Sequence, residues 1–285
     1  MLRNLFTSQA QMDKYLTQIN TGKKIRRPSE DPIIAMKGMN YRTQVSEIEQ
    51  FQRNATEVWN WMDHSDDVLD KATKAIQRME YLAVQAANGS YSGEERKSIK
   101  EEVEQLREQL VELANTKVNG KYIFNGTDTD APPITGENGN FSIGYNPENP
   151  PYPVRIEVSK RIKLQVNVSP EEIFDEDLLQ NIQNFITALD DDDQDALNES
   201  IGNLNESMLK IVNGRADLGA RMNRLELIED RLEQQEIIAT DMMMKNEGVD
   251  FEEAVTNLLT QEVIHRAALA AGSKIIQPSL VDFLR

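Results

Sequence analysis

The chain has 285 residues, a formal net charge of −17 and no cysteine, and only 6% of its residues are aromatic. This length suits one large domain plus a smaller module, and a hydrophobic fraction of 39% is typical of narrow helical stripes. The missing cysteines exclude disulfide frameworks, thiolate metal sites and thiol nucleophiles, and the negative charge disfavours nucleic acid and anionic membranes as partners.

The charge is unevenly distributed along the chain. Residues 1–44 contain eight Lys and Arg against three acidic residues, whereas the remainder contains 23 basic and 45 acidic residues. A basic segment of net +5 therefore precedes an acidic body of net −22. This polarity favours contacts between the basic segment and the acidic body, within one copy or between copies.

Residues 1–30 form the first predicted region, an N-terminal assembly segment. It lacks the apolar run of a secretory signal, so an exported chain would use another route. One apolar residue in three or four does not offset the entropy of ordering a lone helix, so we expect this segment to be disordered in the isolated subunit. Its apolar stripe consists of Leu2, Leu5, Met12, Tyr15, Leu16 and Ile19.

Residues 31–118 are predicted to form a long helical hairpin. Asp31 is the expected N-cap, Pro32 takes the first helical position, and Gly89 marks the end of the first helix. The stripe of this helix steps by four and three residues through Phe51, Ala55, Val58, Met62, Ser65, Leu69, Ala72, Ile76, Met79, Ala83 and Ala86. Ser92 and Glu95 form a capping box before a second stripe from Ile99 to Leu113, which folds back on the first.

Residues 119–170 are predicted to form a small β-rich domain that packs on a helix end. This region is rich in Gly and Pro, and apolar and polar residues alternate in its last two runs. The expected strands span residues 121–124, 141–145, 154–158 and 162–166.

Residues 171–248 are predicted to return as long helices. We expect helix from Glu171 or Asp175, continuing past Asp190–Asp193 into a third stripe between Ile201 and Ala239.

Residues 249–285 form the last predicted region, a C-terminal assembly helix capped by Asp250 and stopped by Gln277 and Pro278. Like the first segment, it needs a partner for its apolar side chains, so we predict that the two ends carry an assembly surface. Its C-terminal members are Phe251, Val255, Leu258, Leu259, Val263, Leu269 and Ile276.

Three patterns suggest other functions. Glu262 and His265 match the E-x-x-H ligand pair of di-metal helical-bundle enzymes, but the motif occurs once and the further glutamates are missing. The run Asp190–Asp193 lacks the spacing of a calcium loop, and the basic loop 21–28 has no aromatic platform for nucleic acid. We therefore expect no catalytic residue, cofactor or metal, no nucleic acid or membrane partner, and a structural role instead of an enzyme.

Four segments resemble the bacterial flagellin family. The loop and helix start TGKKIRRPSEDP, the KYIFNGT motif and the ending IIQPSLVDFLR are more similar to members at the hook–filament junction than to filament flagellin, which stays the alternative. The resemblance implies a mainly α fold with a small β insertion, namely an elongated antiparallel, coiled-coil-like bundle of long helices plus a β-rich outer domain. The four segments span residues 21–45, 114–133, 219–226 and 265–285.

The resemblance also implies location and partners. It implies a secreted subunit of the flagellum, exported unfolded by the type III apparatus, that binds copies of itself, hook-associated protein 1, flagellin and an export chaperone. Leu2–Ile19 and Phe251–Ile276 would line the inner coiled-coil layer, and residues 119–168 would face outward. The chain begins several residues later than is usual for the family, so we expect a shortened N-terminal helix.

Overall fold

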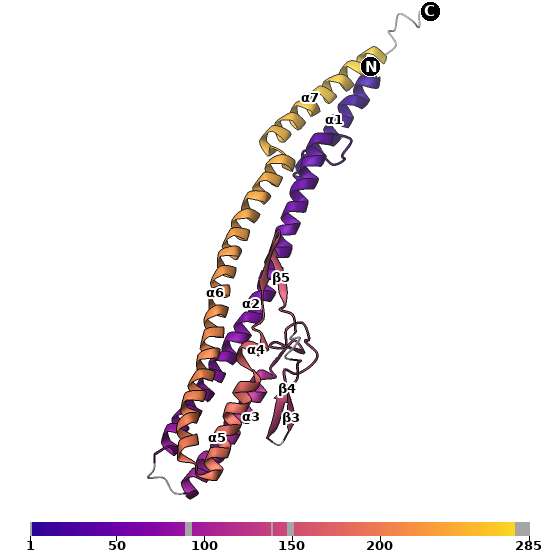
Figure 1. Cartoon of the computed structure of the whole chain (residues 1–285). Helices are drawn as coiled ribbons and strands as arrows, with labels where there is room; N and C mark the ends of the chain where they lie inside the picture. Colours follow the sequence, from indigo (N-terminus) through magenta and orange to yellow (C-terminus); the bar gives the residue numbers. More distant parts are fainter. Residues whose placement is uncertain (1, 89–92, 138, 147–150, 277–285) are drawn as a thin grey trace, which may run out of the picture. The chain divides into compact units, whose positions relative to one another are not determined.

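The computed structural model describes residues 2–88, 93–137, 139–146 and 151–276, with the backbone alone for Leu2, Glu137 and residues 273–276. Most of the described chain is helical, with a small β part inserted between helices, which confirms the expected fold class (Figure 1). The helices are α1 (Leu2–Thr21), α2 (Pro32–Ala86), α3 (Gly93–Ala114), α4 (Pro170–Ile173), α5 (Glu176–Asp191), α6 (Gln194–Glu247) and α7 (Phe251–Ile276).

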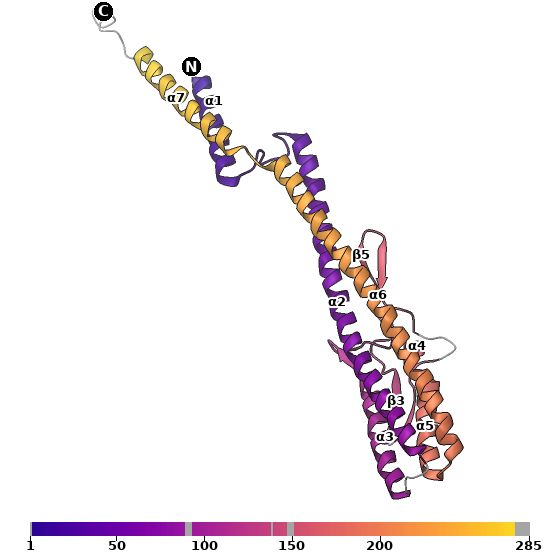
Figure 2. The ribbon, with the colours of Figure 1, turned by 90° about the vertical axis from the view of Figure 1, so that its left-hand side faces the viewer.

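The chain divides into two compact units. The terminal unit comprises Met1–Glu49 and Glu233–Arg285, and the body comprises Gln50–Leu232. In the body, α6 runs antiparallel beside α2 in both ribbon views, and α3 packs against α5 (Figures 1 and 2). The two long helices α2 and α6 contribute to both units.

The core of the body is built on the predicted heptad stripe of α2. Ala55, Val58, Met62, Leu69 and the following stripe residues as far as Ala86 are fully buried, which confirms the three-and-four spacing as a packing face. Phe51 at the start of the stripe is half-buried. A stripe of this kind buries apolar area continuously, and each large side chain contributes about 1.5–3 kcal/mol to folding.

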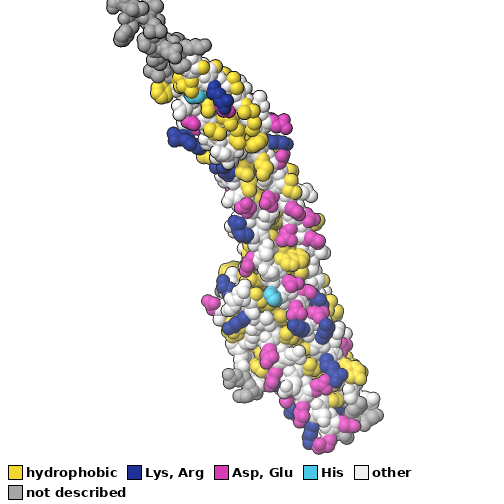
Figure 3. All heavy atoms as spheres, turned by 180° about the vertical axis from the view of Figure 1, so that it is seen from behind, with side chains coloured by type: hydrophobic (Ala, Val, Ile, Leu, Met, Phe, Trp, Pro, Cys, Tyr) yellow, Lys and Arg dark blue, Asp and Glu magenta, His cyan; other side chains and the backbone are white. Residues whose placement is uncertain are grey.

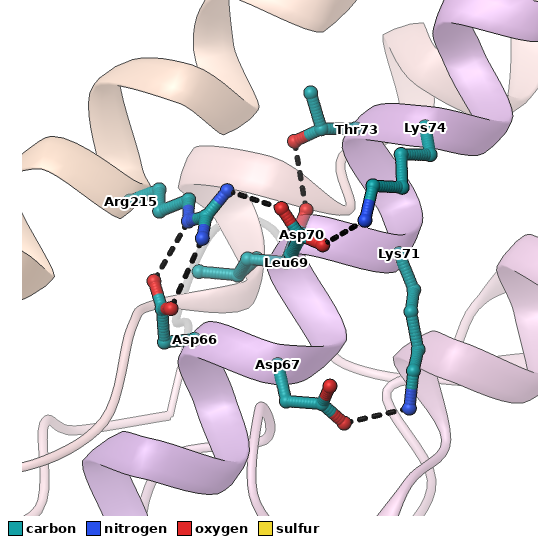
Figure 4. Close-up of polar contacts among 8 residues, drawn as sticks. All are labelled: Asp66, Asp67, Leu69, Asp70, Lys71, Thr73, Lys74 and Arg215. Carbon is teal, nitrogen blue, oxygen red and sulfur yellow. Dashed lines mark hydrogen bonds and ion pairs between the residues drawn. The ribbon is translucent and has the colours of Figure 1, made fainter.

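An ion cluster joins α2 to α6 in the body (Figure 4). Arg215 Nε lies 2.7 Å from Asp66 Oδ1, and its Nη1 lies 2.6 Å from Asp70 Oδ1. Lys74 Nζ contacts the other oxygen of Asp70 at 2.5 Å. The hydrogen bond from Lys74, followed by that from Arg215, lowers the pKa of Asp70 below its ordinary value. Arg215, a charged member of the third predicted stripe, thus links α6 to α2 by ion pairs.

The β part consists of three antiparallel pairs. Two of its strands, β1 and β3, were not predicted: Asn119 and Gly120 both have positive φ and make the tight turn from β1 to β2, as Asn-Gly pairs do in hairpins. The hairpin of β5 and β6 was predicted. The strands are β1 (Lys117–Val118), β2 (Lys121–Tyr122), β3 (Ile134–Glu137), β4 (Asn140–Ile143), β5 (Arg155–Ser159) and β6 (Ile162–Gln165).

The first predicted strand is shorter than expected, because β2 ends at Tyr122. Ile123 and Phe124 are fully buried beyond the end of β2. The Phe124 ring meets Phe174, just after α4, edge to face with centroids 5.2 Å apart. This aromatic pair anchors the β part to the helices that follow it.

The expected continuity of helix through Asp190–Asp193 is wrong. Asp192 has φ 57°, a left-handed conformation that ends α5. Asp193 then caps α6, because its Oδ1 accepts hydrogen bonds from the backbone N–H groups of Asp195 and Ala196. Aspartate tolerates the left-handed region and is a strong N-cap, and both preferences outweigh helix continuation here.

Two predicted caps are confirmed. Asp31 Oδ1 accepts from the N–H groups of Ile33 and Ile34 at 2.9 and 3.0 Å, and Asp250 Oδ1 accepts from Glu253 N at 3.1 Å. The predicted signals at Gly89, Ser92, Gln277 and Pro278 lie outside the described residues.

Candidate assembly interface

The terminal helices α1 and α7 lie side by side and antiparallel (Figures 1 and 2). Ser8 and Ala254 are buried, and Gln261 Nε2 donates to Ser8 Oγ at 3.3 Å. Small residues at these positions allow the two helices to approach closely. The two chain ends therefore pair with each other within one subunit.

A short stretch of backbone fastens the loop after α1 to the connection between α6 and α7. Gly22, with φ +67°, ends α1 and accepts a hydrogen bond from Val249 N at 3.0 Å. Lys24 N donates to Glu247 O at 2.7 Å, and Lys24 Nζ donates to Lys245 O at 3.1 Å. These contacts hold residues 22–24 against the end of α6.

The first turns of α2 approach the same end of α6. Glu247 forms an ion pair with Arg42, and a side chain in place of Gly38 would collide with the Glu247 carboxylate. Asn246 Nδ2 donates to Ile34 O at 3.0 Å. A side chain at position 38 would therefore require the Glu247 carboxylate to move.

The predicted N-terminal assembly residues lie on a partly covered face. Leu5, Met12, Tyr15 and Ile19 are half-buried, and Leu16 is exposed. The side chain of Leu2 is outside the described residues.

The predicted C-terminal assembly residues fall into two groups. Val255 and Leu258 are half-buried. The exposed group consists of Phe251, Leu259 at 56%, Val263 at 66% and Leu269. The side chain of Ile276 is outside the described residues. The role of all these residues in assembly stays a prediction.

Several exposed apolar residues of the terminal unit lie outside the predicted stripes. On the paired helices they are Phe6, 69% exposed, and Ile264. A signal existed, because Leu258–Leu259 and Val263–Ile264 are adjacent pairs and neighbouring helix positions cannot share one narrow face. The missed residues on the other two helices are Ile33, Met36, Met39, Ile237, Ile238, Met242 and Met244.

The terminal unit thus exposes an unusual amount of apolar surface. Among the described residues, fourteen of the twenty exposed large hydrophobic side chains belong to it, but only Ile48, Ala239 and Ala254 of the 43 buried hydrophobic residues do. Figure 3 shows hydrophobic side chains gathered over the terminal helices. Exposed apolar side chains gathered in this number favour an interaction surface.

The E-x-x-H pair on α7 has the surroundings of an ordinary helix surface. Glu262 forms an ion pair with Arg266, one turn along α7, and His265 is half-buried nearby. Across the residues that the structure describes, no three His, Asp or Glu side chains come together as a metal site. None of the described helices combines the length and hydropathy needed to cross a membrane.

Comparison with known proteins gives matches at both ends of the chain. Residues 1–129 match the bacterial flagellin N-terminal helical region, and residues 201–284 match the bacterial flagellin C-terminal helical region. Flagellar hook-associated protein 3 of Escherichia coli is 26% identical, with 95% of this chain and 92% of that protein covered. The flagellar filament 31.3 kDa core protein of Treponema maltophilum is 32% identical, with 75% and 71% covered.

Solved structures share the fold. FlgL of Bacillus cereus is 25% identical and superposes with a TM-score of 0.61 over 72% of this chain and 99% of that chain. The flagellar junction protein FlgL of Legionella pneumophila has a TM-score of 0.60 and 15% identity, with 74% and 100% covered. The expected similarity to hook-associated members is confirmed. The chain belongs to the bacterial flagellin family and is a structural component of the bacterial flagellum.

Proposed function

We propose that this subunit joins hook-associated protein 1 at the hook end to the flagellin filament, by pairing its terminal helices with those of neighbouring copies. The observation that carries the proposal is the exposed apolar surface of the terminal unit, whereas the body buries most of its own apolar residues. The similarity to hook-associated protein 3 over 95% of the chain supports the junction over other flagellar positions.

The proposed role is structural and not catalytic. The subunit is secreted, and an export chaperone covers the ends of the chain before export, since both ends expose apolar side chains. Residues 1–30 and 249–285 are the proposed assembly segments. Residues 119–170 are the proposed outer domain of the junction.

Filament flagellin is the second candidate. The similarity to the Treponema maltophilum filament protein favours it, at 32% identity. The two candidates differ in how far assembly proceeds, because a junction protein adds a limited number of copies and a filament protein adds copies without limit.

Seeded assembly tests the proposal. The full chain is added to isolated hooks that carry hook-associated protein 1, and bound subunits are counted by electron microscopy and quantitative blotting. A limited layer that then accepts added flagellin is the expected result. Unlimited growth from this protein alone would establish filament flagellin instead.

A pair of matched variants tests the surface. Leu259→Ser with Val263→Ser removes two exposed apolar side chains from α7 and should abolish binding to the seeds. The control is Leu209→Ser with Val212→Ser, two apolar residues of α6 in the body that are 51% and 40% exposed. If both variants bind the seeds like the parent protein, the terminal surface does not drive assembly.

A further inference from the structure

A basic pocket lies between the second half of α1 and the loop that follows it. Its volume is about 370 Å³. Lys14, Lys23, Lys24 and Arg26 line it together with Asp13, Glu30 and uncharged neighbours. Lysine and arginine therefore outnumber the acidic residues in the lining.

The cations of this pocket are available to a partner. In the described residues, Lys14, Lys23 and Arg26 make no ion pair, whereas Arg42 nearby is paired with Glu247. The Glu30 carboxylate accepts a hydrogen bond from the backbone N of Arg26 at 2.9 Å. Glu30 therefore holds the loop instead of pairing with its basic side chains.

The pocket is also preorganised. The backbone bonds of Gly22 and Lys24 to Val249 and Glu247 fix the loop, and Gln18 Nε2 donates to Lys24 O at 2.7 Å. A held loop loses little conformational freedom when it binds, so its charges contribute more to affinity than those of a mobile tail.

An acidic stripe lies on α6 in the body. Glu226, Glu229 and Asp230 are spaced by three and one residues, so they share one side of the helix, while Arg224 and Arg231 lie on the other side. No described ion pair involves these three acids. Partial burial, followed by the charges of Asp230 and Glu226, raises the pKa of Glu229.

We propose that the basic pocket of one copy docks on the acidic stripe of a second copy. The net +5 of residues 1–44 and the net −22 of the remainder give this contact a long-range component. The proposal rests on the proposed function, because it requires copies of the chain to assemble side by side. It adds a charged, register-setting contact to the apolar one, since apolar packing alone is not directional.

Charge reversal tests the docking. The pocket variant carries Lys23→Glu and Arg26→Glu, and the stripe variant carries Glu226→Lys and Asp230→Lys. Each alone should lower seeded assembly at low salt by about tenfold, with a smaller loss at high salt. The control is Lys121→Glu with Arg155→Glu, which changes the net charge equally at exposed body positions outside the pocket and should assemble like the parent.

Mixing the two variants distinguishes contacts between copies from contacts within one. In a mixture, the now acidic pocket of the pocket variant faces the now basic stripe of the stripe variant, so assembly should recover. If the contact formed within one chain, assembly would recover only in a quadruple variant that carries all four substitutions, and it would not recover in the mixture. Recovery of the quadruple variant alone would overturn the proposal.

Cross-linking supplies a readout that does not depend on seeds. Labelled (15N) and unlabelled chains are mixed at high concentration and treated with a zero-length carbodiimide reagent. Mixed-isotope cross-links from Lys14 or Lys23 to the acidic stripe are expected. Their absence would overturn the docking, whether or not seeds bind, whereas failure of the parent protein to bind seeds would overturn the proposed function.

Discussion

The two halves of α2 differ in what covers them. In the terminal unit its apolar residues Ile33, Met36 and Met39 are exposed, whereas in the body Leu69 and Ile76 are fully buried. The same helix therefore packs into a core in the body and exposes apolar side chains in the terminal unit. The difference lies in the neighbours present, because helix formation itself is continuous from Pro32 to Ala86.

The body and the terminal unit therefore differ in how much apolar surface each buries within one subunit. The body carries the stability of the monomer, since its apolar residues are already buried. Under the proposed function, the terminal unit would gain most of its apolar burial from other copies.

Hydrogen exchange on the isolated subunit should show the largest contrast. We expect backbone amides of α1 and α7 to exchange at least about a thousandfold faster than those of α2 around Leu69, because helices with little buried surface open locally. Mass spectrometry of peptides measures this directly. Equal protection in both regions would contradict the division into a stable body and a dependent terminal unit.

A core truncation in the body should have the largest effect on stability. Leu69→Ala leaves a cavity at a fully buried position and should lower the free energy of unfolding by about 3 kcal/mol. The matched variant Leu259→Ala in α7 should change it by less than about 0.5 kcal/mol. Chemical denaturation of both variants provides the measurement, and similar losses would show that the terminal unit has its own core.

Removal of the central cation of the ion cluster should have a smaller effect that depends on pH. Arg215→Ala leaves Asp66 and Asp70 without their cross-helix partner and should lower Tm by about 3 °C at pH 7. Because the folded-state pKa of Asp70 is lowered, its contribution exists above its ordinary pKa and is lost as pH falls through the lowered value.

The difference between the parent and Arg215→Ala should therefore shrink in acid, as thermal melts across that range will measure. Lys71→Ala, which removes an exposed pair with Asp67, is the control and should leave Tm nearly unchanged. A difference that persists in acid would show that Arg215 acts through packing instead of charge.

Neutralisation of the acidic stripe should have the smallest effect on the monomer. The raised pKa of Glu229 means that stability falls as pH rises from the ordinary glutamate value through the raised one. Glu229→Gln should therefore raise Tm by about 1 °C at pH 7 and leave it unchanged in acid. Glu199→Gln on the same helix is the control. A destabilised Glu229→Gln would mean that the carboxylate is paired in the fold.

The sequence alone determined the features that depend on neighbours within one helix turn. The buried face from Ala55 to Ala86 could be predicted because buried positions of a helix recur every three or four residues. The N-cap at Asp31 could be predicted because a capping side chain bonds to the backbone of the next few residues. Local patterns can also favour two structures at once. The aspartate run around Asp192 was compatible with one continuous helix and also with the end of one helix followed by the N-cap of the next.

Only the tertiary structure decided which surfaces remain open and which distant segments meet. Nothing near Gly22 or Lys24 in sequence indicates that these residues bond to Val249 and Glu247. Likewise, periodicity identified Val255 and Val263 as one stripe, but burial separates them. Spacing specifies the side of its own helix on which a residue lies, whereas exposure depends on which other helix covers that side.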